Sequence, residues 1–241
     1  MIITGKNSVL EAFQSGKTIE KLFVKKQGNM PAEQQALISQ AKERGVRIEF
    51  MEKQAFEKLV QTNRSTSIAA QVTDFAYAEI EDCFRLAQSR GEALLLVLVD
   101  GVQDPHNLGS ILRVAECAGA HGVIIPKHRN VTVNETVIRV SAGAAEHMLV
   151  VKVNNINQTI EQLKQKNVWV YALDMDGTSI YKQNLTDATA LVVGGEGSGV
   201  SALVRKNVDA IVSFPLKGKV NSLNASVATG VALYEVVRQR G

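Results

Sequence analysis

The sequence predicts an α/β protein with two domains, and three observations lead to this prediction. Its 241 residues are enough for two modest domains with hydrophobic cores. Helical and extended patterns alternate over residues 1–75, which indicates a small α/β domain. From Ala93 onward, continuous apolar runs alternate with helical patterns, as in a mostly parallel sheet that helices cover on both faces.

The first domain, residues 1–75, is expected to contain three helices and three strands. The helices are expected around 7–14, over 31–44 and near 53–60, and the strands over 21–24, 46–50 and 68–72. Pro31 suits the first turn of its helix, and Gly45 suits the position just past the end. Residues 76–92 are polar and acidic, and we expect a linker there that carries a short amphipathic helix ending at Arg90-Gly91.

The second domain, residues 93–241, is expected to contain six buried strands. Their apolar runs cover 94–99, 122–125, 148–153, 168–173, 190–193 and 210–214. In parallel sheets of this kind, ligands bind beyond the carboxyl ends of the strands. Polar and glycine-rich segments follow three of the six runs, so these segments are the candidate site.

Composition excludes several classes of protein. Apolar residues make up 45% and charged residues 21%, which is ordinary globular usage and excludes disorder, collagen-like repeats and coiled coils. The N-terminus lacks a signal-peptide pattern and the longest apolar run is too short for a bilayer, so a cytoplasmic protein without a membrane partner is expected. Cys83 and Cys117 have no metal-ligand or disulfide spacing, and both are expected to be buried.

The positive charge is unevenly distributed. The net charge is +3; residues 1–75 hold 11 Lys+Arg against 8 Asp+Glu, and residues 76–241 hold 16 against 16. A basic excess in one domain is compatible with a phosphate-bearing partner. On charge alone, an ordinary solvated surface explains it better.

The first candidate segment runs from Asp100 to Arg113. Asn107 is placed to cap a helix that begins at Leu108, and Arg113 lies among apolar residues of that helix. A half-buried arginine needs an anionic partner, and a phosphate matches its five fixed donors. A structural ion pair with Glu116 or another carboxylate is an equally good interpretation.

The second segment, residues 193–200, is rich in glycine and contains one charged residue, Glu196. The glycine spacing fits neither the dinucleotide fingerprint nor the phosphate-binding loop of nucleotide triphosphatases. Glycines allow close backbone approach, so main-chain groups could hold an adenine or a ribose there. A plain turn is the alternative.

The third segment follows the last apolar run and its Pro215. Ser222, Asn224 and Ser226 precede an apolar helix rich in small residues, at a place where backbone amides are unpaired. This arrangement suits a neutral ligand or a ribose, and it also suits an ordinary helix cap.

The three segments together resemble the SpoU/TrmH branch of the SPOUT RNA methyltransferases. The motifs are Asp-Pro-x-Asn-x-Gly-x-x-x-Arg, Gly-x-Glu-Gly-x-Gly and Pro-x-x-Gly-x-x-x-Ser-Leu-Asn-x-Ser-x-Ala, in this order over residues 93–241. Residues 1–75, with Gly5-Lys-Asn-Ser-Val-Leu-Glu-Ala, resemble the ribosomal-protein-L30e-like RNA-binding domain of family members that methylate a guanosine ribose in large-subunit rRNA.

The resemblance implies a fold, a cofactor and partners. The fold would be a parallel-sheet SPOUT domain with a C-terminal trefoil knot, preceded by a small L30e-like α/β domain. The cofactor would be S-adenosyl-L-methionine, and no metal is required. The partners would be 23S rRNA, with the ribose 2′-hydroxyl of a guanosine as substrate, and a second copy of the chain bound through the knotted domain.

The resemblance also assigns roles to residues. Gly194, Phe214 and Leu223 would contact the cofactor, mainly through backbone, and the catalytic side would be lined by Asn107, Arg113, Glu196, Ser222 and Asn224. Arg113 would act as the proton acceptor or, equally well on physical grounds, as a clamp on the phosphate beside the target ribose. Gly195 stands where family members often have Asn, so no side-chain role is expected there.

Other functions remain open at this stage. Methylation of tRNA, or of an adenosine in rRNA, would use the same residues. A non-catalytic RNA-binding protein would have no reason to keep the whole set of site residues. A nucleotide-binding oxidoreductase is disfavoured because the dinucleotide fingerprint is absent.

Overall fold

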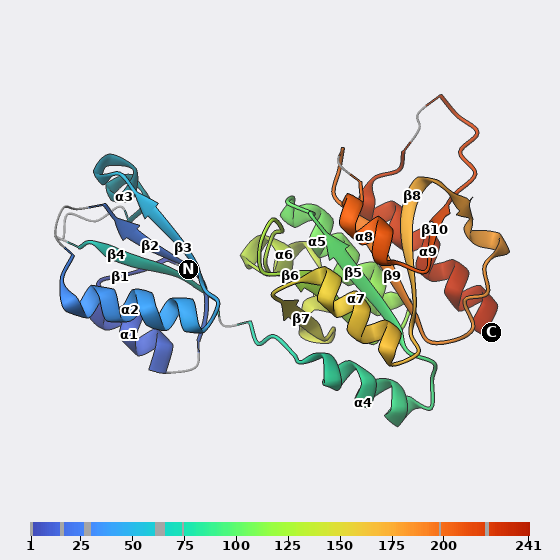
Figure 1. The fold of residues 1–241 in the computed structure, drawn as a ribbon, viewed down its shortest axis with the longest axis horizontal. Coiled ribbons are helices and arrows are strands. Elements are labelled where there is room, and N and C mark those ends of the chain that lie inside the picture. The colour runs from blue at the N-terminus through green and yellow to red at the C-terminus, as the bar shows by residue number, and fades with distance from the viewer. Residues whose placement is uncertain are drawn as a thin grey trace. The chain divides into compact units, whose positions relative to one another are not determined.

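The chain forms two compact units, which comprise Met1–Ala76 and Tyr77–Gly241 (Figure 1). The computed structural model describes residues 2–14, 17–26, 30–60, 66–73, 75–197, 199–219 and 222–241. Each unit has a sheet of its own and a separate core of buried apolar side chains. The boundary lies beside residue 75, where the first domain is expected to end.

A four-stranded sheet in the order β1-β4-β2-β3 forms the first unit. Its elements follow one another as β1 (Ile2–Thr4), α1 (Lys6–Gln14), β2 (Thr18–Lys25), α2 (Ala32–Glu43), β3 (Arg47–Met51), α3 (Lys53–Val60) and β4 (Ile68–Thr73). β2 and β3 are parallel, whereas β4 runs antiparallel to β1 and β2. The expected helices and strands are confirmed. The short β1 is additional, and its strand character comes from its pairing with β4.

The two faces of this sheet pack against different helices. Leu22 of β2 is buried with Val9 of α1 and Leu37 of α2, whereas the adjacent Phe23 packs with Phe56 of α3. Successive side chains of a strand point to opposite faces. Helices α1 and α2 therefore cover one face, and α3 covers the other.

Helix α4 (Ile80–Arg90) lies in the expected linker, but it packs as part of the second unit. Its Cys83 and Ala87 are buried in the same apolar cluster as Leu96 of the second sheet. Gly91 ends the helix in the left-handed conformation, with a φ of 66°. The expected helix is thus confirmed, but residues 80–90 are a structural layer of the second unit.

The two cysteines differ in environment. Cys83 is buried, and desolvation raises the pKa of its thiol to about 12, so it packs as a small apolar side chain. Cys117 is exposed at the end of α5, and the expectation that both cysteines are buried is wrong for this residue. The helical pattern of α5 places it on the solvent side, opposite the buried Ile111 and Ala115.

A six-stranded parallel sheet in the order β10-β8-β9-β5-β6-β7 forms the second unit. Its strands are β5 (Leu95–Asp100), β6 (Gly122–Pro126), β7 (Val150–Val153), β8 (Trp169–Ser179), β9 (Thr189–Gly194) and β10 (Ala210–Ser213). The predicted parallel sheet is confirmed. β8 extends to Ser179 rather than ending at Leu173, because its second half pairs with β10 after an irregularity in register.

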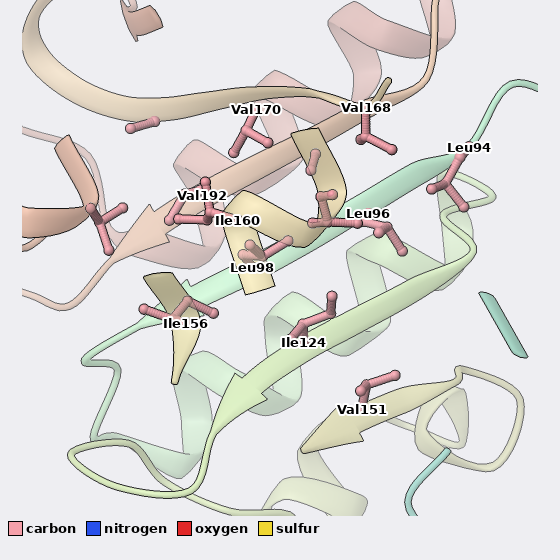
Figure 2. Close-up of a cluster of buried hydrophobic side chains, with 14 of the residues drawn as sticks. Leu94, Leu96, Leu98, Ile124, Val151, Ile156, Ile160, Val168, Val170 and Val192 are labelled. Carbon is pink, nitrogen blue, oxygen red and sulfur yellow. The ribbon is translucent and has the colours of Figure 1, made fainter. Parts of the chain in front are cut away.

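Helices cover both faces of this sheet, as predicted. They are α5 (Pro105–Cys117), α6 (Glu135–Val140), α7 (Ile156–Gln165), α8 (Ala202–Asn207) and α9 (Ala225–Arg240), with short 3₁₀ turns η1 (Ala144–Glu146) and η2 (Ile180–Lys182). Figure 2 shows one face, where Leu96, Leu98 and Val192 of the strands pack with Ile156 and Ile160 of α7. Helices α5 and α9 pack together on the other face. No helix in the described part of the chain is long and apolar enough to cross a bilayer.

The strand order places a topological switch between β5 and β9. From β5 the chain continues to β6 and β7 on one side, and the later strands β9, β8 and β10 lie on the other side. Asp100 at the carboxyl end of β5 pairs with Gly194 at the carboxyl end of β9. Ligands of open parallel sheets bind at such switch points. The segments that follow β5, β9 and β10, and the part of β8 beyond its pairing with β9, therefore meet at the expected binding edge.

A buried histidine makes the stability of the second unit sensitive to pH. The Nδ1 atom of His121 accepts a hydrogen bond from the backbone N–H of Leu95 (3.0 Å), and its Nε2 atom lies 3.1 Å from Glu92 Oε2. Burial lowers the pKa of His121. Below about pH 6.5 the unfolded state therefore binds a proton that the folded state does not, so the free energy of unfolding falls as the pH decreases from there toward the folded-state pKa.

We expect denaturant unfolding to give a lower free energy at pH 5.5 than at pH 7.5, and His121→Asn to reduce this difference. Asparagine keeps an acceptor for Leu95 N–H but does not titrate. If the variant and the parent protein lose equal stability between the two pH values, His121 is not the group responsible.

Candidate active site

Helix α5 begins earlier than expected, and this frees the side chain of Asn107. The helix starts at Pro105, and Asp104 caps it by accepting a hydrogen bond from His106 N–H (2.9 Å). The prediction that Asn107 caps a helix starting at Leu108 is therefore wrong. Proline favours the first helical position, and Asp104 is the stronger candidate for the cap next to it. Asn107 lies within the first turn and is buried.

Three of the predicted catalytic residues form a closed group of hydrogen bonds. Asn107 Nδ2 donates to Glu196 Oε1 (3.0 Å), Asn224 Nδ2 donates to the same oxygen (2.7 Å), and Asn224 Nδ2 also donates to Asn107 Oδ1 (2.8 Å). The three residues come from the segments after β5, β9 and β10. The prediction that these distant segments meet at one place is confirmed. We call this group the Asn-Glu-Asn triad.

Asn224 uses both ends of its side-chain amide. Its Oδ1 atom caps helix α9 by accepting hydrogen bonds from the N–H of Ser226 (2.9 Å) and Val227 (3.4 Å), and it accepts the Ser226 hydroxyl at 2.6 Å. Its Nδ2 atom faces the triad. The helix-cap interpretation of this segment is therefore confirmed, and the same side chain also belongs to the triad. The cap fixes the direction in which the amide donates.

The glycine-rich loop after β9 is held against the end of β5. Gly195 N–H donates to Asp100 O (2.9 Å), and Ser201 N–H donates to Asp100 Oδ2 (2.8 Å). A side chain at Gly194 would place its Cβ 2.1 Å from Gly199 C, so the loop closes tightly over this residue. Gly197 has a φ of 80°. The loop therefore needs glycine for close backbone approach at one position and for a left-handed conformation at another.

A cavity of about 580 Å³ lies at this edge of the sheet. All three predicted cofactor-binding residues line it: Gly194, Phe214 and Leu223. Glu196, Ser222 and Asn224 line it as well, so one side of the triad borders the cavity. Asn221, between Phe214 and Ser222 in the third segment, lies outside the described residues. The cavity volume is within the range of about 300–1,000 Å³ that small-molecule sites occupy.

Arg113 is the predicted site residue that the structure does not bring to this group. It is exposed and does not line the cavity, so the expectation of a half-buried guanidinium is wrong. Because a helix advances about 100° per residue, six residues place Arg113 about 120° around α5 from Asn107. No ion pair between described residues includes Arg113, and Glu116 is exposed too. The guanidinium is therefore available to an external anion.

The middle of β8, where its pairing with β9 ends at Leu173, is a part of the cavity that the sequence analysis missed. Leu173, Asp174 and Met175 line the cavity. The signal was present, because Asp174 directly follows a buried apolar run, as do the other three segments of this edge. Residues 174–179 are also polar and contain Gly177, but they belong to none of the three family motifs, so the sequence analysis did not include them.

The described residues contain no group of three or more histidine, cysteine or acidic side chains that could hold a metal ion. The polar groups of the described residues that line the cavity are one side-chain amide, one hydroxyl, two carboxylates and backbone groups. These groups suit an organic ligand with an apolar ring and several hydrogen-bonding positions.

Solved structures with a similar fold are RNA methyltransferases. The SpoU methyltransferase AviRb from Streptomyces viridochromogenes, in complex with the cofactor AdoMet, has a TM-score of 0.63 and 24% identity, over 100% of this chain and 90% of that one. The AdoMet-bound rRNA methyltransferase from Sinorhizobium meliloti has a TM-score of 0.58 and 21% identity, over 98% and 86%. At these identities the matches establish a shared fold.

Sequence relatives and family models cover nearly the whole chain. The protein YacO of Bacillus subtilis (strain 168) is 37% identical over 99% of this chain and 95% of its own length, and a Staphylococcus aureus (strain COL) protein is 38% identical over 99% and 96%. Both names assign these proteins to the TrmH family of tRNA/rRNA methyltransferases. Residues 2–78 match the model described as RNA 2′-O ribose methyltransferase substrate binding, and residues 94–234 match the SpoU rRNA methylase family. The chain therefore belongs to the SpoU rRNA methylase family, within the SpoU/TrmH RNA methyltransferases.

Proposed function

We propose that this protein transfers a methyl group from S-adenosylmethionine to the ribose 2′-hydroxyl of a guanosine in 23S rRNA. The observation that carries the proposal is the Asn-Glu-Asn triad on the border of the cavity. The cavity accommodates a cofactor, and the triad offers fixed polar groups beside it. The family supports RNA as the substrate, and the motifs quoted above support the ribose as the site of methylation.

The residues around the cavity fit S-adenosylmethionine. Leu173, Val193, Phe214 and Leu223 offer apolar contacts for the adenine, and the backbone of the loop at Gly194 offers donors and acceptors for the polar edges. When bound, the cofactor supplies a methyl group activated by its attachment to a positively charged sulfur. The protein then has to place the ribose hydroxyl in line with that methyl group.

The triad holds its members in place for this task. Glu196 Oε1 accepts two amide N–H groups, from Asn107 and Asn224, so neither amide can rotate without losing a hydrogen bond. We propose that Glu196, Asn224 and the neighbouring Ser222 contact the ribose and that Asn107 positions Glu196. A ribose hydroxyl is a poor nucleophile at neutral pH, and fixed hydrogen-bond partners lower the barrier by orienting it.

Arg113 is proposed to clamp a phosphate of the RNA. Its exposed guanidinium has no carboxylate partner among the described residues, and its planar fork matches phosphate oxygens. Arginine stays protonated in proteins, so a clamp is a better role for this residue than a proton acceptor. The proton of the hydroxyl then leaves to water or to another acceptor.

A second copy of the chain is proposed to pack against helix α9. Val227, Val231, Tyr234 and Val237 are exposed and recur at helical spacing, so they form an apolar stripe on α9. A dimer through this stripe would use the C-terminal domain. Light scattering at micromolar concentration is expected to give twice the mass of one chain, and a single-chain mass would refute the dimer.

We also propose an L30e-like RNA-binding role for residues 1–75 and a trefoil knot in the C-terminal domain. The match of residues 2–78 to a substrate-binding family and the basic excess of residues 1–75 support the first proposal. The knot itself follows from the family, because ordinary topology makes knots rare.

The decisive experiment is methyl transfer from labelled S-adenosylmethionine to 23S rRNA and to tRNA, followed by mapping of the modified nucleotide. We expect label in 23S rRNA, on the 2′-oxygen of a guanosine. The variant Asn224→Ala should abolish the label because it removes both the cap of α9 and two triad hydrogen bonds. Label in tRNA alone, or on an adenosine, would refute the substrate. RNA binding without any label would indicate a non-catalytic protein.

A further inference from the structure

The proposed cofactor cavity is acidic. Among the described residues that line it, Asp174 and Glu196 are charged, and both are carboxylates. The remaining lining residues are apolar, glycine, serine or asparagine. An acidic cavity with few charges favours a ligand that carries positive charge inside it.

Asp174 is held in place by two groups and lies beside the glycine-rich loop. Its Oδ1 atom accepts a hydrogen bond from Met175 N–H (2.7 Å), and its Oδ2 atom pairs with Arg205. The side chain is only 16% exposed. A Cβ at Gly199 would lie 3.4 Å from Asp174 Oδ2, so the carboxylate also lies directly beside the glycine-rich loop. The carboxylate therefore has a fixed position between the middle of β8 and this loop.

Arg205 neutralises only part of the local negative charge. Its guanidinium also binds Asp176, at 2.8 Å and 2.7 Å from the two carboxylate oxygens, and this contact lowers the pKa of Asp176. Two carboxylates thus share one guanidinium, which leaves a net charge of about −1 beside the cavity. Asp176 does not line the cavity, whereas Asp174 does.

The second carboxylate, Glu196, has uncharged partners. Its hydrogen bonds come from the side-chain amides of Asn107 and Asn224. Amides orient the carboxylate but do not cancel its charge. Both acidic groups of the cavity therefore contribute negative potential to whatever binds there.

We propose that this acidic lining, with Asp174 as its main determinant, makes the cavity bind S-adenosylmethionine more tightly than S-adenosylhomocysteine. The inference rests on the proposed function. The two molecules share an ammonium and a carboxylate, but the sulfur is a cation in the first and neutral in the second. In the transfer, the S–CH₃ bond breaks with its electron pair left on sulfur, an O–CH₃ bond forms, and the hydroxyl proton passes to solvent. The positive charge thus leaves the cavity, and product binding weakens.

The test compares three ligands by isothermal titration calorimetry: S-adenosylmethionine, S-adenosylhomocysteine and sinefungin, which carries an ammonium in place of the methylsulfonium. S-adenosylmethionine and sinefungin carry one more positive charge than S-adenosylhomocysteine. We expect the parent protein to bind both of them more tightly than S-adenosylhomocysteine. Asp174→Asn should weaken binding of both by about tenfold, and of S-adenosylhomocysteine by less than about twofold. Asparagine keeps the size of the side chain and one oxygen acceptor.

Asp176→Asn is the matched control, because it removes a partner of Arg205 without changing the lining of the cavity. Because Asp176 is 68% exposed and does not line the cavity, solvent screens its charge, and this variant should reduce the preference for S-adenosylmethionine over S-adenosylhomocysteine much less than Asp174→Asn does. Glu196→Gln preserves an acceptor for both amides. Like Asp174→Asn, it should reduce the preference for S-adenosylmethionine over S-adenosylhomocysteine. If a thermal melt shows that Asp174→Asn is not folded, the ligand affinities of Glu196→Gln decide whether the acidic lining favours S-adenosylmethionine.

Three results would overturn the inference. They are an equal loss of affinity for all three ligands in Asp174→Asn, a parent protein that prefers S-adenosylhomocysteine, and an Asp176→Asn variant that changes the ratio as much as Asp174→Asn does. A parent protein that binds none of the ligands would instead refute the proposed cofactor. If the protein prefers S-adenosylmethionine over S-adenosylhomocysteine as expected but methylates no RNA, the inference stands and the proposed function is refuted.

Discussion

Replacing Gly194 with alanine is expected to lower the affinity for S-adenosylmethionine by about ten- to a hundredfold, since overpacking costs about 1–3 kcal/mol and each 1.4 kcal/mol is tenfold in affinity. The added Cβ would lie 2.1 Å from Gly199 C, 2.3 Å from Gly199 O and 2.4 Å from Val200 N. All three atoms belong to the backbone, so the glycine-rich loop has to move away from the cavity that it lines. Overpacking of this kind also lowers the free energy of unfolding by about 1–3 kcal/mol. Calorimetric titration of the cofactor and denaturant unfolding measure the two effects separately.

Gly197→Ala is the matched control in the same loop. No atom lies within 4 Å of its added Cβ, and the φ of 80° makes the substitution strained by backbone conformation alone. We expect a loss of about 1 kcal/mol in stability and a change in cofactor affinity well below that of Gly194→Ala. Equal affinity losses in both variants would show that loop strain, rather than close packing at Gly194, governs binding.

Much of the fold follows from local sequence patterns. The six strands of the second sheet are continuous apolar runs because both of their faces are buried, and this makes them easy to recognise. The end of β8 was harder to predict, because Asp174, Asp176 and Gly177 are poor strand formers. Their strand conformation comes from pairing with β10, a contact between distant segments that the local pattern does not contain.

The candidate site shows the same division between local and tertiary information. The cap at Asn224 is a local feature and was predictable. The triad required the family motifs, because hydrogen bonds between segments so far apart have no local signature. Two local inferences were wrong: Asp104 takes the cap expected of Asn107, and Arg113 is exposed. The apolar neighbours of Arg113 belong to other faces of the helix, so sequence adjacency overstated its burial.

Arg113→Ala is expected to reduce turnover by about a hundredfold while leaving the affinity for S-adenosylmethionine within about twofold, because removing a single charged donor from a reacting site has effects of this order. Arg113 does not line the cavity, so cofactor binding does not depend on it. An exposed guanidinium that clamps the phosphate beside the target ribose would fix the hydroxyl in line with the methyl group. Single-turnover methylation of saturating RNA, combined with calorimetry of the cofactor, measures both quantities.

Two further variants separate a phosphate clamp from a general electrostatic effect. Arg113→Lys keeps the charge but loses the planar fork, so it should recover only a small part of the turnover. Arg85→Ala removes an exposed arginine of α4 that pairs with Asp82, and it should leave turnover unchanged. A proton acceptor at Arg113 would instead make the rate of Arg113→Lys strongly pH-dependent near the lysine pKa. Normal turnover in Arg113→Ala would exclude both roles, and the catalytic contribution would then rest on Glu196, Ser222 and Asn224 alone.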